Sequence, residues 1–329
     1  MKTSQKILEY ITEKGQVSGK ELTDYLGSVT DRAIRKQLKT LLEKGEVRKI
    51  GQPPKVFYSI VSCAAKKENA PTDISVIDRV TRRIIDDRYL YITSGGEMKH
   101  GWEGFVLWCE KTRQDPIKTG KEYVSTVRKY DAFSKNGLLD GMRKIRNTFD
   151  EVFLDKLFYL DFYSIERFGK TKLGQILLHA KQSQDRKLMR SLIEDVRPKI
   201  LALIKRWSID GVLFVPPTLK REVQFMKELE KYLKLPTRIL SVSKVKTPVV
   251  IAQKTLTKLE DRIENARKTI VVEESATFEN ILIIDDAVGS GSTLNETAAQ
   301  IRKRGLCRGK VIGLAITGSF KGFDVISEV

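Results

Sequence analysis

The sequence predicts an α/β protein: a doubly wound parallel sheet in its C-terminal half, a mainly helical middle region, and a small helical domain with a β-hairpin at the N-terminus. Two patterns lead to this prediction. After residue 161, short apolar runs alternate with amphipathic helical segments, which is typical of parallel sheets. In the first sixty residues, helical periodicity with strong turn signals gives way to two strand-like runs.

The length of 329 residues suits two or three domains, each large enough to bury a core. Residues 62–73 are small and polar and read as a linker, so we expect domains at residues 1–62 and 161–329 and a middle region at residues 73–160. Cys63, Cys109 and Cys307 lie far apart without a CxxC pair, which indicates neither a disulfide framework nor a zinc site.

The chain is basic, with 60 Lys and Arg against 42 Asp and Glu and a net charge of +18. The excess is spread over every part of the sequence, so it favours a nucleic-acid partner only weakly. No segment approaches the roughly 20 apolar residues of a membrane span, and the first residues are amphipathic, unlike a signal peptide. We therefore expect a cytoplasmic protein without a membrane partner.

Three helices and a hairpin are predicted in the first sixty residues. One helix ends near Gly15, residues 18–21 form a capping box that opens the second, and a third begins near Thr30. Strands at residues 46–50 and 55–61 follow. The third helix is apolar on one side and cationic on the other, and the hairpin has basic flanks; these cations are Arg32, Arg35, Lys36, Lys39, Arg48, Lys49 and Lys55.

This order of elements predicts a winged helix-turn-helix domain. Such a domain inserts its last helix into the major groove of DNA and lets the hairpin contact the adjacent backbone. The seven cations are therefore candidate nucleic-acid-binding residues. A winged helix that serves only protein contacts or dimerisation is the alternative, because a fold does not fix a function.

A strand, a small-residue loop and a helix follow one another at residues 280–304. Asp285 and Asp286 end the apolar run, and the loop consists of Val288, Gly289, Ser290, Gly291, Ser292 and Thr293. Backbone N–H groups in such a loop, hydroxyls and the following helix N-terminus all favour a bound phosphate. Carboxylates beside a phosphate site suit a ligand that also carries hydroxyls, so a sugar phosphate is expected.

Residues 281–294 (ILIIDDAVGSGSTL) resemble the signature of type I phosphoribosyltransferases. The resemblance implies that the loop binds the 5-phosphate of phosphoribosyl pyrophosphate (PRPP), that Asp285 and Asp286 are the catalytic carboxylates contacting the ribose hydroxyls, and that Mg²⁺ is held on the pyrophosphate. This chain has Gly289 and Ser290 where the family more often has Thr.

From about Phe162 onward the chain looks like the ComF branch of these proteins. Shared landmarks are Lys181 in a helical region, strands at residues 211–215, 238–242 and 310–317, and a Q...R..N pattern at Gln253, Arg262 and Asn265. The resemblance implies that Lys220, Arg221 and Arg262 lie on the pyrophosphate side. The cysteine-rich zinc finger common in that branch is missing from this sequence.

Two other features favour structural roles. Residues 153–168 are rich in aromatic side chains, and we expect this helical stretch to pack in the core rather than stack on bases. His100 and His179 have no metal-ligand neighbours in the sequence.

Three functions fit these features. The chain is an enzyme that transfers a phosphoribosyl group, a PRPP-sensing DNA-binding regulator similar to the purine repressor of Gram-positive bacteria, or a defence effector similar to those found beside retron reverse transcriptases. We favour catalysis, because both carboxylates and the loop are present, and expect PRPP, DNA or a reverse-transcriptase complex, and a second copy of the chain as partners.

Overall fold

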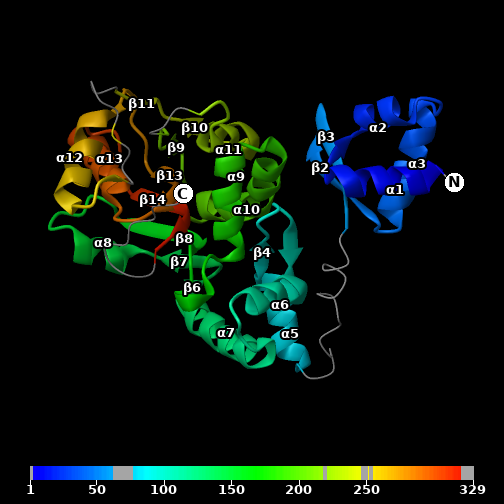
Figure 1. Ribbon diagram of the computed structural model, residues 1–329. Helices are drawn as coiled ribbons and strands as arrows, with labels where there is room; N and C mark the ends of the chain where they lie inside the picture. The colour runs from blue at the N-terminus through cyan, green and yellow to red at the C-terminus, as the bar shows by residue number, and fades with distance from the viewer. Residues whose placement is uncertain (1–2, 62–76, 218–220, 246–250, 252–254, 320–329) are drawn as a thin grey trace. The chain divides into compact units, whose positions relative to one another are not determined.

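A computed structural model describes residues 3–61, 77–217, 221–245, 251 and 255–319 (Figure 1). It divides the chain into two compact units, Met1–Val76 and Ile77–Val329. The predicted linker at residues 62–73 lies outside the described residues. None of the described helices is long and apolar enough to cross a membrane.

The first unit contains the three predicted helices and the predicted hairpin. Its elements are α1 (Thr3–Lys14), β1 (Val17–Ser18), α2 (Gly19–Leu26), α3 (Asp31–Glu43), β2 (Val47–Gln52) and β3 (Lys55–Ile60). The strands form an antiparallel sheet in the order β1-β3-β2. The apolar faces of the helices meet in one core, which includes Ile7, Ile11, Leu22, Ile34 and Leu38.

The predicted capping box at the start of α2 is confirmed. The Ser18 backbone N–H donates to Glu21 Oε2 at 2.6 Å, and the Glu21 N–H donates to Ser18 Oγ at 3.2 Å. These bonds satisfy donors that the first turn of a helix otherwise leaves unpaired. The hydrogen bond from the Ser18 backbone also lowers the pKa of Glu21.

The second unit is built on one large sheet. Its first part contains α5 (Arg79–Arg88), β4 (Leu90–Ile92), β5 (Met98–His100), α6 (Gly101–Lys111), α7 (Pro116–Asp131), β6 (Ser134–Lys135), β7 (Leu138–Asp140) and α8 (Met142–Thr148). The rest contains β8 (Lys156–Phe162), α9 (Lys172–Ser183), α10 (Arg186–Arg206), β9 (Gly211–Phe214), α11 (Phe225–Leu233), β10 (Arg238–Ile239), β11 (Val242–Lys244), α12 (Leu259–Thr269), β12 (Ile270–Val272), β13 (Ile281–Val288), α13 (Ser292–Lys303) and β14 (Val311–Gly318).

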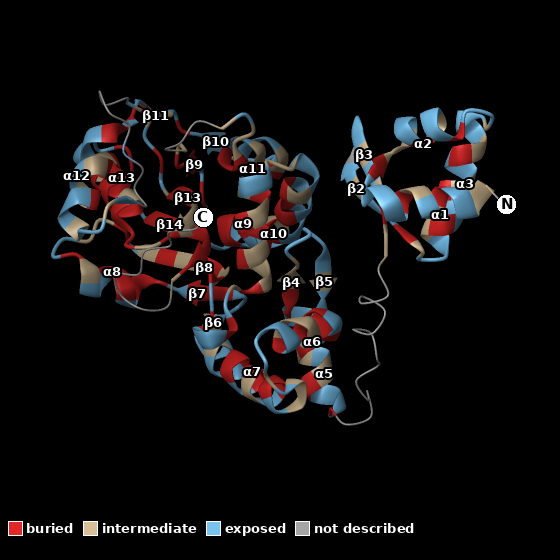
Figure 2. Cartoon of the chain, in the orientation of Figure 1, coloured by how far each residue is buried: buried red, intermediate tan, exposed pale blue. Residues whose placement is uncertain are grey.

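The seven strands of this sheet run in the order β10-β9-β13-β14-β8-β7-β6. The first five are mutually parallel, and β7 and β6 are antiparallel additions at one edge. Helices α9, α10 and α11 pack on one face, and α8 and α13 pack on the other. The central strands are therefore buried on both faces (Figure 2), as parallel sheets require.

The aromatic stretch at residues 153–168 corrects our expectation of a helix. It contains strand β8, which pairs with β14 in the interior of the sheet. Tyr159, Phe162 and Tyr163 are buried in the core, as we expected for these side chains. The predicted boundary between residues 160 and 161 lies inside β8, so strands on both sides of it belong to one sheet.

Two other element bounds also differ from the sequence prediction. The strand continues past the acidic pair to Val288, and the next helix begins at Ser292, inside the predicted loop at residues 288–293. The single strand expected at residues 238–242 is two short strands, because β10 joins the large sheet while β11 pairs with β12. Cys109 and Cys307 are buried free thiols, and Cys63 lies outside the described residues.

The capping box yields a first prediction. Ser18→Ala removes the oxygen that accepts the Glu21 N–H, and the stability of α2 should fall by about 1 kcal/mol. Hydrogen exchange of the α2 amides in the full chain measures this loss. Ser18→Thr keeps the acceptor and should retain most of the protection; equal exchange in all three proteins would contradict the role of the cap.

Candidate functional site

The predicted acidic pair occupies the carboxyl half of β13. Side chains alternate between the two faces of a strand, so Asp285 and Asp286 point to opposite faces. Asp285 follows Ile281 and Ile283, which pack in the same core as α13, whereas Asp286 follows Ile284, which packs in the core with α9. The two carboxylates therefore meet different surroundings.

Asp286 is held in an ion pair. Lys181 of α9 places its Nζ 2.6 Å from Asp286 Oδ2, and the two side chains are only 14% and 19% exposed. Arg221 in turn donates from Nη1 to the backbone carbonyl of Lys181. The structure thus joins Asp286, Lys181 and Arg221, three residues that the sequence separates by up to 105 positions.

Asp285 is half-buried and accepts the backbone N–H of Asp286 at 2.8 Å. Burial and, secondly, the neighbouring Asp286 carboxylate raise the pKa of Asp285 to about 7, while Lys181 and Lys244 act in the opposite direction. Lys244 ends β11, and burial lowers the pKa of its ammonium. A carboxyl group that titrates near neutrality is characteristic of functional sites.

The loop after β13 leads directly into α13. Gly291 adopts a left-handed conformation (φ +91°) and occupies the N-cap position of α13, where it has no side chain to cap the helix. The first turn of α13 contains no acidic residue. The Ser292 N–H donates to Ser290 Oγ at 3.3 Å. A helix N-terminus without an acidic first turn suits an anion.

The loop hydroxyls are arranged differently from our expectation. Ser290 and Ser292 are 4% and 2% exposed, and their hydroxyls hydrogen-bond each other at 2.7 Å. They stabilise the loop from within, whereas Gly289 and Thr293 retain partial exposure and Val288 is buried. We expected Ser290, Ser292 and Thr293 all to offer hydroxyl donors to a ligand.

Helix α8 of the middle region forms a wall of the loop. A Cβ atom at Gly291 would lie 2.7 Å from Ile145 Cδ1, so a larger residue would require that side chain to shift, and the positive φ of +91° disfavours any other residue here. Lys144, which is 9% exposed, donates to the hydroxyl of Ser319 just beyond β14. The Ser319 N–H donates to the Val288 carbonyl at 3.2 Å, which ties this residue to the start of the loop.

Of the other two residues predicted on the pyrophosphate side, the structure describes only Arg262. Lys220, like Gln253 of the Q...R..N pattern, lies outside the described residues. Arg262 is 5% exposed and donates from Nε to the Leu256 carbonyl at 2.8 Å, and burial lowers its pKa. A guanidinium so enclosed is positioned to hold its own loop, so its role toward pyrophosphate stays a prediction.

Sequence reasoning did not assign Lys144 and Lys244 to the site. Lys144 lies in a helical segment with basic residues on either side, so the sequence did not predict that it is buried. Lys244 acts on Asp285, and it lies in β11, which pairs with β12. Lysine is rarely buried without a partner, but its burial is visible only in the folded chain. No local pattern could have identified either residue.

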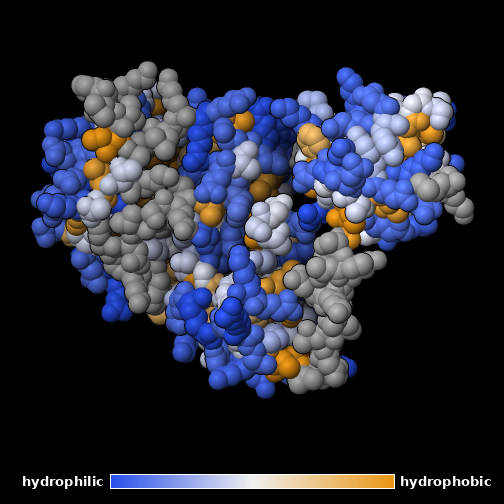
Figure 3. All heavy atoms as spheres, viewed as in Figure 1, coloured by the Kyte–Doolittle hydropathy of each residue, from blue (hydrophilic) through white to orange (hydrophobic). Residues whose placement is uncertain are grey.

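The predicted nucleic-acid-binding residues of the first unit are all exposed. Arg32, Arg35, Lys36 and Lys39 surround a shallow depression of about 540 Å³ on α3. Arg48, Lys49 and Lys55 lie on the hairpin, where Arg48 Nε donates to Ser59 Oγ at 3.0 Å. The visible face of this unit is predominantly hydrophilic (Figure 3).

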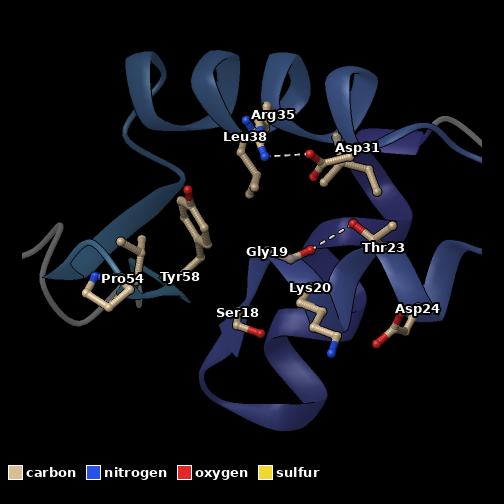
Figure 4. A pocket seen from close by; sticks show the side chains of 12 residues that line it. Ser18, Gly19, Lys20, Thr23, Asp24, Asp31, Arg35, Leu38, Pro54 and Tyr58 are labelled. Atoms are coloured by element: carbon tan, nitrogen blue, oxygen red, sulfur yellow. Dashed lines mark hydrogen bonds and ion pairs between the residues drawn. The ribbon is translucent and has the colours of Figure 1, made fainter.

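A second hollow of about 490 Å³ lies between α2, α3 and the hairpin (Figure 4). Arg35 contributes to its lining, but its guanidinium lies 2.6 Å from the carboxylate of Asp31 one helical turn away. Asp24 and Asp31 also line the hollow. The hollow therefore carries both signs of charge, and the cationic surface is concentrated on the outer face of α3.

Comparison with known proteins finds a family match for part of the second unit. Residues 198–318 match the phosphoribosyl transferase domain family. This range contains the acidic pair, the loop and α13. The chain therefore contains a phosphoribosyltransferase-type domain. No curated protein sequence matches the chain.

Three solved structures of purine phosphoribosyltransferases show low overall similarity. A hypoxanthine-guanine phosphoribosyltransferase from Bacillus anthracis is 13% identical, with 40% of this chain and 65% of that chain covered and a TM-score of 0.25. The hypoxanthine enzyme of Staphylococcus aureus is 16% identical (37% and 60% covered, TM-score 0.22). That of Trypanosoma cruzi is 14% identical (42% and 80% covered, TM-score 0.27). The chain thus spans about two thirds of the length of the Bacillus anthracis protein.

Opposite effects on stability are predicted for the two adjacent carboxylates. Asp285→Asn removes a charge that burial disfavours and keeps the oxygen that accepts the Asp286 N–H, so it should stabilise the fold at pH 8 by about 1 to 2 kcal/mol. Asp286→Asn deprives Lys181 of its counter-charge and should destabilise the fold by about 1 kcal/mol. Urea unfolding of both variants and the wild type measures the difference.

The pH dependence of the stability difference between Asp285→Asn and the wild type is the control for this prediction. An acid whose folded-state pKa is raised from 3.8 to about 7 stabilises the fold at low pH, and this stability is lost as pH rises between these values. The advantage of Asp285→Asn should therefore grow from pH 4 to pH 7 and level off above. A constant difference across this range would show that Asp285 is ionised throughout.

Proposed function

We propose that the second unit binds PRPP and transfers its phosphoribosyl group to a nucleophilic acceptor. One observation carries the proposal: half-buried Asp285 and Asp286 lie near the end of β13, and the loop that follows places Gly291 at the N-cap position of α13. The loop suits the 5-phosphate, and the two carboxylates suit the ribose hydroxyls. The family match at residues 198–318 supports this assignment.

The charges around the acidic pair favour a polyanionic ligand. Lys181 and Lys244 balance the two carboxylates, and Arg221 adds a further cation next to Lys181. The positive ends of the aligned peptide dipoles of α13 face the same region. A ligand that carries phosphates together with hydroxyls matches this combination better than a bare phosphate or a neutral sugar.

The carboxylate oxygens of Asp285 and Asp286 are the hard ligands that suit a magnesium ion arriving with the substrate. Among the described residues, no group of three or more His, Cys, Asp or Glu side chains is arranged to hold a metal. Mg²⁺ commonly keeps several waters and binds through one or two carboxylates and substrate phosphates, so Asp285 and Asp286 would face its hydration shell. When bound, the ion neutralises charge on the pyrophosphate.

In the proposed reaction the acceptor forms a bond to the anomeric carbon of the ribose, and the bond from that carbon to the pyrophosphate oxygen breaks. The chain contributes chiefly by positioning and electrostatics. Ionised Asp285 accepts a ribose hydroxyl and stabilises positive charge that develops on the sugar. The loop fixes the phosphate end, so that the ribose is presented in one orientation.

The first unit is proposed to be a nucleic-acid-binding winged helix. Its three helices and antiparallel strands follow the order that this domain requires, and its third helix exposes four cations on one face. A sensor that couples PRPP to nucleic-acid binding is the second candidate function. It requires different ligand affinities in two states of the chain, so PRPP must change nucleic-acid affinity at fixed salt.

Calorimetric titration with PRPP and Mg²⁺ tests the proposed site. We expect saturable binding by the wild type and binding weakened roughly 10- to 100-fold in Asp286→Asn, because a hydrogen bond to a charged group is lost. Pyrophosphate release with nitrogen-nucleophile acceptors should disappear in the same variant. Glu279→Gln, an exposed position just before β13, should bind normally. Absence of binding by the wild type would overturn the proposal.

Salt dependence tests the first unit separately. The logarithm of affinity for a labelled DNA duplex should fall linearly with the logarithm of salt concentration, and Lys36→Ala should reduce that slope by about 1. Arg35→Ala should have a smaller effect, because Arg35 already pairs with Asp31. Lys6→Ala on α1 is the matched control; an equal loss in this variant would show that the binding is not specific to α3.

A further inference from the structure

Lys144 is a buried cation that the proposed chemistry has not yet used. It lies in α8, within the middle region, and only 9% of it is exposed. Neighbouring Arg143 and Arg146 are exposed, so these two cations of α8 face solvent while Lys144 faces the protein interior. Its ammonium has polar interactions within the folded chain, the Ser319 hydroxyl among them.

The position of this ammonium is defined from two sides. Lys144 donates to the Ser319 hydroxyl, and the Ser319 N–H donates to the carbonyl of Val288 at the start of the loop. The adjacent Ile145 contacts the loop again at Gly291. The lysine is therefore held beside the same short segment that leads from β13 into α13.

Hydrogen bonds to β8 and α13 hold helix α8 and the segment after it in place. The Gly141 N–H donates to the Leu157 carbonyl of β8 at 2.8 Å, which anchors the start of the helix. Asn295, which is 1% exposed, accepts the Phe153 N–H and donates to the Glu151 carbonyl, both at 2.9 Å. These bonds attach the segment after α8 to the first turns of α13. The lysine is thus preorganised next to the loop.

The loop itself supplies no cation. Residues 288–293 contain no Lys or Arg, and Ser290 and Ser292 are bonded to each other. Lys181 pairs with Asp286, and Lys244 acts on Asp285. A phosphate monoester carries between one and two negative charges near pH 7. Lys144 is a cation that the structure connects to the start of this segment through Ser319, and its neighbour Ile145 lies against Gly291.

We propose that Lys144 is a ligand-binding residue that donates to the phosphate group held by the loop at residues 288–293, so the middle region completes the phosphate site. This inference rests on the proposed function, because it assumes that the loop binds a sugar phosphate. It adds a contact from outside the segment that matches the phosphoribosyl transferase family, which begins at residue 198.

Three probes separate this role from a purely structural one. Ribose 5-phosphate and PRPP with Mg²⁺ both place a phosphate in the loop, whereas magnesium pyrophosphate does not require it. Lys144→Met should weaken binding of the first two ligands by a similar factor, roughly 10- to 100-fold, and leave pyrophosphate binding unchanged. Lys144→Arg should restore much of the affinity, since it keeps the charge. Arg143→Met, on the exposed face of α8, should match the wild type.

Each contrary result has a definite meaning. Wild-type affinity of Lys144→Met for ribose 5-phosphate would overturn the role of Lys144 and leave the proposed function intact. Equal weakening of all three ligands, together with a lowered melting temperature, would show that Lys144 only supports the fold. Failure of the wild type to bind either sugar phosphate would overturn the proposed function itself.

Discussion

The central constraint in this structure is the placement of two adjacent carboxylates at the end of a buried parallel strand. Like charges at such a position repel, and burial penalises both. The pleat of β13 separates them by turning Asp285 and Asp286 to opposite faces. Each face then supplies a lysine from a different element, Lys181 from α9 and Lys244 from β11. The sheet order and helix packing matter for function because they bring these cations to the strand end.

The raised pKa of Asp285 follows from the same constraint. One carboxylate has a close ion-pair partner, whereas its neighbour is left with a burial penalty that a ligand hydroxyl can relieve. A site that is not optimised for stability in the free protein is typical of functional positions, where activity and stability compete. The same reasoning applies to the phosphate loop. A bound anion accepts hydrogen bonds from the backbone N–H groups at the N-terminus of α13 and so stabilises this end of the helix.

Local patterns predicted the parts of this protein that depend on neighbouring residues. The capping box at Ser18 and Glu21, the cationic face of α3 and the strand–loop–helix around Asp285 could all be read from short stretches. The sequence-based prediction missed that β8 is a strand, because a short apolar and aromatic run suits a buried strand and a buried helix equally well. It also could not place Lys144 or Lys244, whose contacts join segments far apart in the chain. Nor could it show that the hydroxyls of Ser290 and Ser292 hydrogen-bond each other in the folded loop.

We propose that the loop at residues 288–293 binds a phosphate while the acidic pair binds the attached pentose. A crystal structure of the full chain with ribose 5-phosphate tests this most directly. We predict that the phosphate accepts hydrogen bonds from the loop amides and that the ribose hydroxyls donate to Asp285 and Asp286. Density for the ligand at another location, or a sugar bound with its phosphate directed away from the loop, would contradict the claim.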